Sequence, residues 1–534
     1  MNRCVLPAWD QLPFVVLGKI YNYLEPQDRL NASQTCRLWR GVLFQKRFFN
    51  NFKFTLQINN ERQYTFFRQT LCNLATEVTI NFDFMNVFHI EKVRKILYRI
   101  ARCNNLRGLH FSTSNMGIIA PGIKNKEKLI DIEQCFIEPL KMFLNRKNYP
   151  CKILDLGAIE ALTYYGFEIL KSLGKPDALL QLTLASIKFD SCNYAIPTIE
   201  PSLLQKCSSL QALSLDYDCL NENLLHAMEI LPLKKLLVCV HNVNRQHPGI
   251  SNKSWARFGA AFPNIDLIVS LVYAFEAVEV LQVRILRRSM PITHLRVLFC
   301  DIMNAEALDW MSINNSSTLK SIQWIDSAYK HSNKNVMDLF IRSGQDPFVM
   351  MAWRCKNLEE IVIHGYVIDP HNIVGMSRLR GKSLKRLEIS MIDQTPTEAS
   401  MDSFIDEINT LLGHKWEPIP PNKLHPALGY IKHFGWFFAN IKINGANKAI
   451  ENKQPSAPQP QPIEVVDPKI AETKPAPAPK PAQPAPKPVV APTPAPSPPK
   501  PIEKLAPATP PTTPTTSPSI KPTPFCFSRL WTFS

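Results

Sequence analysis

Cysteine and histidine are the side chains of this sequence that could do chemistry, as nucleophiles, proton carriers or metal ligands. The chain contains 13 cysteines and 12 histidines. They are scattered singly, with no Cys-x-x-Cys pair and no Cys/His cluster at the spacing of zinc ligands. We therefore interpret the cysteines as reduced thiols of the protein core. This includes the five that lie in or beside leucine-rich segments: Cys151, Cys192, Cys207, Cys219 and Cys239.

Two histidines directly follow short apolar runs. His241 ends the run VCVH and His364 ends the run VIH, so each could line the rim of a sheet, although a surface or core position is the simpler interpretation. No G-x-x-x-x-G-K-[ST], G-x-S-x-G or H-E-x-x-H motif occurs, and the 534 residues include only 18 glycines. The sequence therefore predicts no catalytic residue, no metal site and no cofactor.

The charge of the chain is strongly basic. Its 61 Lys and Arg residues exceed its 45 Asp and Glu residues by 16, which raises acidic partners and nucleic acid as candidates. The surplus is spread along the chain, without a dense Lys/Arg run or a basic stripe interleaved with aromatic residues. This distribution favours a solubilising surface over a nucleic-acid site.

The apolar segments also bear on where the protein resides. No basic segment followed by a long apolar stretch occurs near residue 1, so we expect no secretory signal. The most apolar run, IDLIVSLVYAF from Ile265, is followed at once by Glu276 and Glu279 and is shorter than the roughly 20 residues of a membrane helix. We predict a soluble protein that is cytoplasmic, nuclear or both, and that has no membrane partner.

A short pattern, x-x-L-x-x-L-x-L, recurs through the middle of the chain. Clear copies include SLQALSL from Ser209, NLEEIVI from Asn357 and SLKRLEI from Ser383. The middle apolar positions of the copies are Val78, Leu109, Leu154, Leu182, Leu213, Leu236, Ile268, Leu295, Ile322, Ile361 and Leu387. They are spaced by 23 to 45 residues, and most spacings are close to the period of leucine-rich repeats.

The alternation L-x-L places two apolar side chains on one face of a short strand and the residue between them on the other face. Helix-like segments such as NENLLHAMEIL from Asn221 lie between the copies. We therefore predict an α/β fold for residues 51–392, a leucine-rich-repeat solenoid of about ten or eleven repeats. Its parallel strands would line the concave side and its helices the outside.

An ordinary globular α/β domain with leucine-rich strands is the alternative interpretation. The number of copies and the absence of glycine-rich turns favour the solenoid. In the solenoid, the residues between the paired leucines would face the concave side. Examples are Ser214, Arg296 and Glu388, which share no single chemical character.

The composition changes sharply near Lys448. Of the 45 prolines in the chain, 25 lie between Pro455 and Pro524, and proline-rich sequence with few large side chains does not form a packed core. We therefore predict a disordered Pro/Ala/Lys/Thr-rich tail over 448–534. It ends in FCFSRLWTFS, which is either a short docking peptide or without function. The aromatic segment before the tail, 393–447, is predicted to cap the last repeat.

The first fifty residues predict three short helices. In LPFVVLGKIYNYL the apolar side chains recur along one broad helical face, and Pro13 suits a first turn. Pro26 should end this helix and start a second one, and Ser33 is the expected cap of a third. A unit of this size is near the lower limit for independent folding, so it should pack on the repeats, bind a partner, or both.

The spacing W-x-x-L-P-x-x-V-L-x-x-I-Y-x-Y-L, followed by D-x-L-x-x-S-x-x-C-R-x-W, resembles an F-box over about 40 residues. The matching positions are Trp9, Leu12, Pro13, Val16, Leu17, Ile20, Tyr21, Tyr23, Leu24, Asp28, Leu30, Ser33, Cys36, Arg37 and Trp39. The sequence departs from the family at Val15, where the family usually has Glu. It also departs at Gly18, which lies inside the first helix and costs about 1 kcal/mol relative to alanine.

The resemblance implies that residues 1–50 dock on the Skp adaptor of a cullin-RING ubiquitin ligase. By this analogy, the adaptor-binding residues are Leu12, Pro13, Val16, Leu17, Ile20, Tyr21, Leu24 and Leu30, whereas Cys36 and Trp39 belong to the core of the module. An F-box followed by leucine-rich repeats is similar to the substrate-receptor family of these ligases. In that family the repeats hold a protein substrate, and the receptor itself is not an enzyme.

Two other functions remain open at this point. The chain could be an F-box leucine-rich scaffold without a role in ubiquitination. It could also be a basic repeat protein that binds acidic partners or nucleic acid. The identity of the substrate cannot be read from the sequence.

Overall fold

The computed structural model describes residues 9–48, 51–56, 61–83, 86–113, 131–157, 159–185, 199–241, 247–326, 345–393 and 400–419. The chain divides into two units, residues 1–452 and 453–534, and every described residue belongs to the first. The predicted tail 448–534 with its FCFSRLWTFS end, most of the predicted cap 393–447 and Cys192 lie outside the described residues.

Three short helices begin the described chain: α1 (Phe14–Tyr23), α2 (Pro26–Ser33) and α3 (Arg37–Leu43). Pro13 directly precedes α1, and Pro26 is the first residue of α2, as expected for a residue with a fixed φ and no amide hydrogen. The predicted cap at Ser33 is wrong. Its hydroxyl donates to the Leu30 carbonyl 2.6 Å away within α2, and α3 begins only after Cys36.

Within the described residues, twelve strands follow in a single sheet, in which each strand pairs in parallel with the next one in the sequence. They are β1 (Asn51–Thr55), β2 (Glu77–Phe82), β3 (Gly108–Thr113), β4 (Ile153–Asp155), β5 (Gln181–Thr183), β6 (Ala212–Asp216), β7 (Lys235–Val240), β8 (Asp266–Val272), β9 (Ile292–Leu298), β10 (Ser321–Ile325), β11 (Glu360–Ile368) and β12 (Arg386–Ile392). This strictly sequential order is that of a solenoid and not of a globular α/β sheet.

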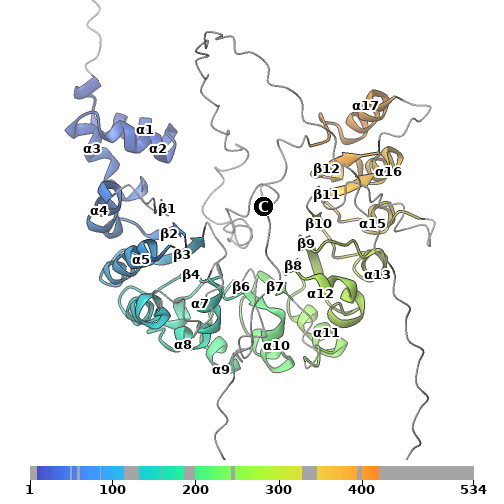
Figure 1. The fold of residues 1–534 in the computed structure, drawn as a ribbon, viewed down its shortest axis with the longest axis horizontal. Helices are drawn as coiled ribbons and strands as arrows, with labels where there is room; N and C mark the ends of the chain where they lie inside the picture. The colour runs from blue at the N-terminus through green and yellow to red at the C-terminus, as the bar shows by residue number, and fades with distance from the viewer. Residues whose placement is uncertain are drawn as a thin grey trace, which may run out of the picture. The chain divides into compact units, whose positions relative to one another are not determined.

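The helices that lie between the strands and after the last strand form one layer on the outer side of the sheet (Figure 1). They are α4 (Glu61–Gln69), α5 (Val87–Ile100), α6 (Glu138–Leu144), α7 (Glu160–Tyr164), α8 (Gly166–Lys171), α9 (Pro201–Gln205), α10 (Glu222–Met228), α11 (Asn252–Ala261), α12 (Phe275–Glu279), α13 (Ala305–Asn314), α15 (Pro347–Arg354), α16 (Pro370–Arg380) and α17 (Met401–Leu412). The predicted fold class, with strands inside and helices outside, is confirmed.

Several of these helices begin at a side chain that accepts a hydrogen bond from the first turn. The capping residues are Asn86, Asn221, Ser251, Asn304, Asp346, Asp369 and Ser400. Such caps satisfy backbone amides that have no partner inside the helix. They fix the point at which the chain turns from the sheet back into the helical layer.

The repeated leucine pattern sets the register of the sheet. The predicted middle positions pair with one another from Val78 to Leu236, and again from Leu295 to Leu387. Ile268 is the exception, because Leu267 pairs with Leu236 and the register shifts by one residue between β8 and β9. Strand β8 is apolar at nearly every position, so alternation did not indicate which residues face the helices.

Both faces of the sheet contain buried apolar residues. The large core lies between the sheet and the helices and includes nearly all the repeated leucines. A smaller cluster lies on the opposite face and includes Leu237, Ile268, Ile325 and Val362. Ile268 thus belongs to the inner face of the solenoid and not to the helix-facing core.

The last described segment packs on the end of the sheet. Helix α17 contacts α16, and after it the buried Trp416 donates its indole hydrogen to the Leu387 carbonyl of β12 over 2.8 Å. The Ile419 amide donates to the Ile389 carbonyl of the same strand. Residues 400–419 therefore cover part of the final strand. Within the described residues, no helix combines the length and apolar character needed to cross a membrane.

Candidate functional site

Helices α2 and α3 contact one side of α1. Leu17 and Tyr21, one helical turn apart, are fully buried. The Tyr21 hydroxyl donates to the Trp39 carbonyl of α3 over 2.9 Å, and the Arg29 guanidinium of α2 donates to the Tyr21 carbonyl over 2.9 Å. The Trp39 indole donates to the Trp9 carbonyl over 2.9 Å. The first two contacts join α1 to α3 and α2, and the third joins α3 to the residues before α1.

The other side of α1 carries apolar side chains that remain exposed. Val16 is 40% exposed, Val15 71% and Tyr23 90%, and just before them Trp9 is 64% exposed and Phe14 44%. Isolated exposed apolar residues are ordinary, but several of them on one short helix indicate a surface that binds another protein. The side of α1 away from its core is therefore the first candidate site.

The eight residues predicted to bind an adaptor fall into three classes of exposure. Pro13 and Val16 are exposed. Leu12, Ile20, Leu24 and Leu30 are half-buried and pack against the core. Leu17 and Tyr21 differ from the expectation, because both are fully buried on the inner side of the helix. They position α1 and present no surface of their own.

Sequence reasoning left Phe14, Val15 and Tyr23 out of the candidate surface. The signal that could have found them is that α1 is apolar at every position except Gly18, Lys19 and Asn22, which is more than one buried face requires. The glycine inside α1 also has a structural reason, since a Cβ at Gly18 would overlap the Arg47 guanidinium. That guanidinium lies 4.8 Å from the centre of the Phe48 ring.

Residues 9–55 match the family model described as F-box-like. The N-terminal helices are an F-box-like domain, and the sheet is a leucine-rich-repeat solenoid. The matched segment begins at the exposed Trp9 and ends with β1, so it includes the three helices and the first strand of the sheet.

Similar proteins extend the match beyond the F-box-like domain. Human F-box only protein 33 is 22% identical over 472 residues, which are 76% of this chain and 82% of that protein. Sheep F-box/LRR-repeat protein 21 is 22% identical over 429 residues, 77% of this chain and 89% of that protein. Among solved structures, the leucine-rich repeat-containing protein LegL7 from Legionella pneumophila covers 63% of this chain at 13% identity and a TM-score of 0.32.

The inner face of the solenoid contains several polar residues that sequence reasoning placed there. Ser214 pairs with Thr183 of β5 and with Leu237 of β7, Arg296 pairs with Gln323 of β10, and Glu388 pairs with Val362 of β11. Ser214 and Arg296 are buried, whereas Glu388 is half-buried. The inner face is thus densely packed at these positions.

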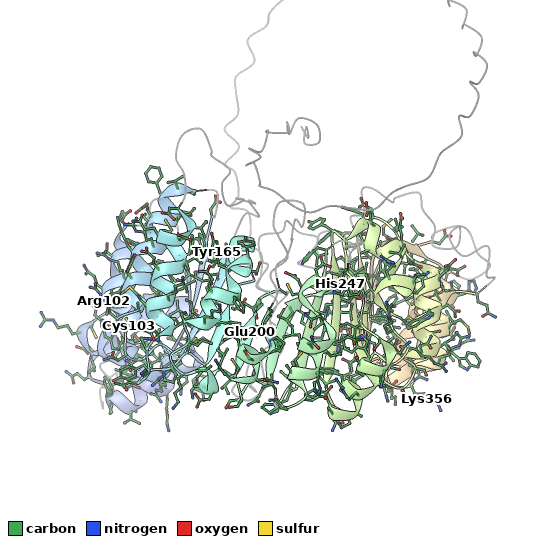
Figure 2. The ribbon with its side chains drawn as sticks, turned by 90° about the horizontal axis from the view of Figure 1, so that it is seen from below. Arg102, Cys103, Tyr165, Glu200, His247 and Lys356 are labelled. Atoms are coloured by element: carbon green, nitrogen blue, oxygen red, sulfur yellow. The ribbon has the colours of Figure 1, made fainter. Side chains whose placement is uncertain are left out.

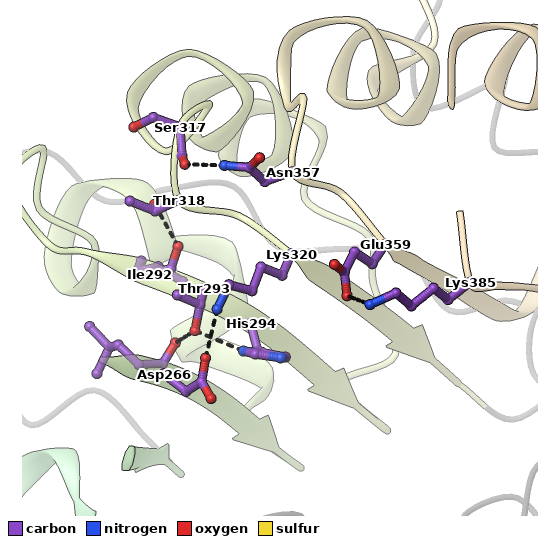
Figure 3. A network of polar contacts seen from close by, with 11 residues as sticks. Asp266, Ile292, Thr293, His294, Ser317, Thr318, Lys320, Asn357, Glu359 and Lys385 are labelled. Carbon is purple, nitrogen blue, oxygen red and sulfur yellow. Dashed lines mark hydrogen bonds and ion pairs between the residues drawn. The ribbon is translucent and has the colours of Figure 1, made fainter. Parts of the chain in front are cut away.

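A ladder of polar contacts crosses the starts of strands β8 to β12 (Figure 3). Lys320, just before β10, reaches over β9 to the Asp266 carboxylate, with 2.9 Å between nitrogen and oxygen, and Lys385 pairs with Glu359 over 2.8 Å. The Thr293 hydroxyl lies 2.7 Å from His294 Nδ1, and burial lowers the pKa of His294 to about 4. These groups already have partners, so their main effect is to keep neighbouring strands aligned.

Two aromatic residues stand out where β8 and β9 end. Tyr273 and Phe299 have φ angles of 51° and 57°, a region that bulky residues rarely adopt. Their rings are stacked 5.4 Å apart at 20°, and both pack against the inner-face cluster. Backbone strain concentrates at functional sites. This aromatic pair is the second candidate site, and no sequence signal indicated it.

Of the cysteines and histidines considered first for chemistry, those that the structure describes lie in structural positions. Burial raises the pKa of Cys151 to about 12 and that of Cys207 to about 11, which keeps both thiols protonated and unreactive. His241 Nε2 lies 2.9 Å from an Asp216 oxygen, and His364 is fully buried. Over the described ranges, no group of three or more His, Cys, Asp and Glu residues could hold a metal ion.

His110 of β3 lies buried between two carboxylates of neighbouring strands. Its Nε2 is 2.7 Å from a Glu77 oxygen, and its Nδ1 is 3.3 Å from an Asp155 oxygen. Burial by itself would lower the pKa of His110, but the hydrogen bonds and charges of Asp155 and Glu77 outweigh burial and raise it. Because both ring nitrogens have a carboxylate partner, this cluster links three neighbouring strands and is not a catalytic triad.

We expect His110→Gln to destabilise the solenoid by about 2 kcal/mol at pH 6, because two charge-assisted hydrogen bonds are lost. A raised pKa means that the stabilisation is complete below the ordinary histidine value of about 6.5 and is lost as the pH rises through the folded-state pKa. The difference between native protein and variant in urea unfolding should therefore shrink towards alkaline pH. A difference that does not change with pH would show that His110 is neutral.

Proposed function

We propose that the chain is the substrate-recognition subunit of a Skp-cullin-F-box ubiquitin ligase. The F-box-like domain docks on the Skp adaptor, and the solenoid holds a target protein. The observation that carries the proposal is the exposed apolar side of α1 within a domain that matches the F-box-like model. An order of F-box-like domain and then leucine-rich repeats supports the second half of the proposal.

The mechanism requires no reactive side chain on this protein. Holding a target close to a charged conjugating enzyme raises the effective concentration of its lysines. The rigid packing of Leu17 and Tyr21 serves this purpose, because a firmly held α1 presents the adaptor with a preorganised surface. Direct adaptor contacts come from Pro13, Val16 and the half-buried Ile20.

The stacked Tyr273 and Phe299 are our candidates for target contact on the solenoid. Aromatic side chains contribute large binding energies where a partner removes them from water. A left-handed backbone at both residues fixes the pair before the target arrives. The target would be a protein, since the solenoid presents an extended surface.

The test is capture of the purified Skp adaptor by the full chain. We expect the double variant Val16→Asp and Tyr23→Asp to weaken binding at least about tenfold, equivalent to about 1.4 kcal/mol, because two charges replace exposed apolar contacts. Both positions are exposed, so the domain should still fold. Charged substitutions at the half-buried Leu12 or Ile20 would confuse loss of binding with loss of folding.

Asn104→Asp with Asn148→Asp is the matched control, because it adds two negative charges at exposed positions outside the F-box-like domain. It should bind the adaptor like the native chain. Equal binding by the double variant, or no binding by the native chain, would refute the proposal. If the chain binds the adaptor, but no bound protein becomes more abundant when the chain is depleted, the scaffold alternative would be favoured. Salt-sensitive retention of nucleic acid would favour the basic repeat protein.

A further inference from the structure

A cationic hollow lies on the outer surface of the first repeats, between α4 and α5. Its volume is about 520 Å³, within the range of ligand-binding pockets of roughly 300–1,000 Å³. Its lining includes four guanidinium groups and one ammonium group, together with a tyrosine: Arg68, Arg94, Lys95, Arg99, Arg102 and Tyr98. We call this feature the cationic hollow.

The periodicity of α5 explains why these side chains converge. Tyr98 and Arg99 lie three and four residues after Lys95, and Arg102 lies three residues after Arg99, so they share one face of the helix and of the turn after it. The opposite face is buried in the core through Val93, Ile96, Leu97 and Ile100. Arg68 joins them from the last turn of α4. Figure 2 shows Arg102 at the outer edge of the helical layer.

Elsewhere on the helical layer, cations are paired with carboxylates of the neighbouring helix. Lys141 pairs with Glu168 over 3.1 Å, and Arg257 pairs with Glu229 over 2.6 Å. The cationic hollow is different. Within the part of the chain that the structure describes, no ion pair joins Lys95, Arg99 or Arg102 to a carboxylate.

Like charges gathered in one hollow repel one another. The nearby C-terminal ends of α4 and α5 offset part of this repulsion, because a helix carries partial negative charge at its C-terminus. A bound anion would offset the rest. The arrangement therefore has the charge, the size and the unused hydrogen-bond donors of an anion-binding site.

We propose that the cationic hollow binds an anionic segment of a protein, whose charge comes from phosphorylated residues or from clustered carboxylates. Guanidinium groups bind both kinds of anion through paired hydrogen bonds. A nucleic-acid backbone fits less well, because it requires a longer cationic track. Here Glu91, 3.4 Å from the Arg94 guanidinium, and Glu138, which accepts a hydrogen bond from Tyr98, border the hollow with negative charge.

The site is separate from the adaptor surface, so it can be tested on the full chain without the adaptor. The probes are three fluorescein-labelled peptides of one sequence, which carry two phosphoserines, two glutamates or two unmodified serines. We expect saturable binding of the phosphorylated peptide, the glutamate peptide or both in fluorescence anisotropy, and weak binding of the neutral peptide. Lys95→Glu with Arg102→Glu, both at exposed positions, should lower the affinity at least about tenfold.

The matched control is Arg288→Glu with Lys356→Glu, which changes the net charge equally at exposed positions outside the hollow. It should keep the native affinity. Circular dichroism and thermal melting of both variants separate loss of binding from loss of folding. Equal losses in both variants, binding of the neutral peptide as tight as that of the anionic ones, or tighter binding of a single-stranded RNA of equal charge would each overturn the proposal. None of these results depends on whether the Skp adaptor binds.

Discussion

Replacing Gly365 with alanine is expected to lower the free energy of unfolding by about 3 kcal/mol. Gly365 lies inside β11 with a φ angle of 83°, which costs any other residue about 1–3 kcal/mol. A Cβ at this position would also overlap the backbone carbonyl of Asp326, with only 2.8 Å to its carbon atom. The backbone of Asp326 cannot move away freely, because the Asp326 amide donates to the His364 carbonyl over 3.0 Å.

Urea unfolding followed by circular dichroism would measure the change. Gly375→Ala is the control, since Gly375 lies inside α16 and its Cβ would meet only the Val349 methyl groups at 3.7 Å. Alanine should stabilise that helix by about 1 kcal/mol. If the two substitutions had similar effects, the left-handed backbone at Gly365 and its contact with Asp326 would not exist in solution.

Replacing Arg146 with alanine should destabilise the first repeats by about 3 kcal/mol. Arg146 follows α6, and its guanidinium donates to the Leu106 carbonyl over 2.9 Å and to the Cys103 carbonyl. It also donates to the Phe143 carbonyl over 2.8 Å and lies 4.1 Å from the centre of the Phe143 ring. Alanine would leave three carbonyl groups without this donor and would remove the ring contact.

Hydrogen exchange would show where this loss acts. In a solenoid each repeat contacts only its neighbours, so faster exchange should appear in β3 and β4 and not in β9 to β12. Arg146→Lys should recover only part of the stability, because one ammonium group cannot reach all three carbonyls. Lys147→Ala, at the exposed neighbouring residue, should change nothing. Uniform acceleration along the whole sheet would contradict this local role.

The repeated leucines allowed most of the sheet to be predicted from the sequence. Where an L-x-L alternation is clear, as at Leu213 and Leu387, only one register buries the leucines. The predicted register was wrong at Ile268, because β8 has apolar residues on both faces of the sheet. The leucine pattern also missed β1, whose sequence NFKFT contains phenylalanine instead of leucine.

The candidate sites were less predictable because they depend on partners far apart in the sequence. The resemblance to an F-box identified α1, but only packing revealed that Leu17 and Tyr21 face inward. His110 contacts Glu77, which lies 33 residues earlier in the sequence, and Asp155, which lies 45 residues later. The cationic hollow combines α4 with α5, and although the stretch from Lys92 to Arg102 is rich in Lys and Arg, the sequence alone does not show that Arg68 of α4 lies beside it.

The sequential order of the twelve strands has a consequence for how the protein is made. Because every strand pairs only with its immediate neighbours in the sequence, each repeat can fold as soon as it leaves the ribosome, on a template already completed. At every stage the newest strand leaves an open edge, where another chain could add. That exposure decreases when α17 and Trp416 are synthesised and cover part of β12. Residues 400–419 therefore limit the time for which this edge is open to another chain.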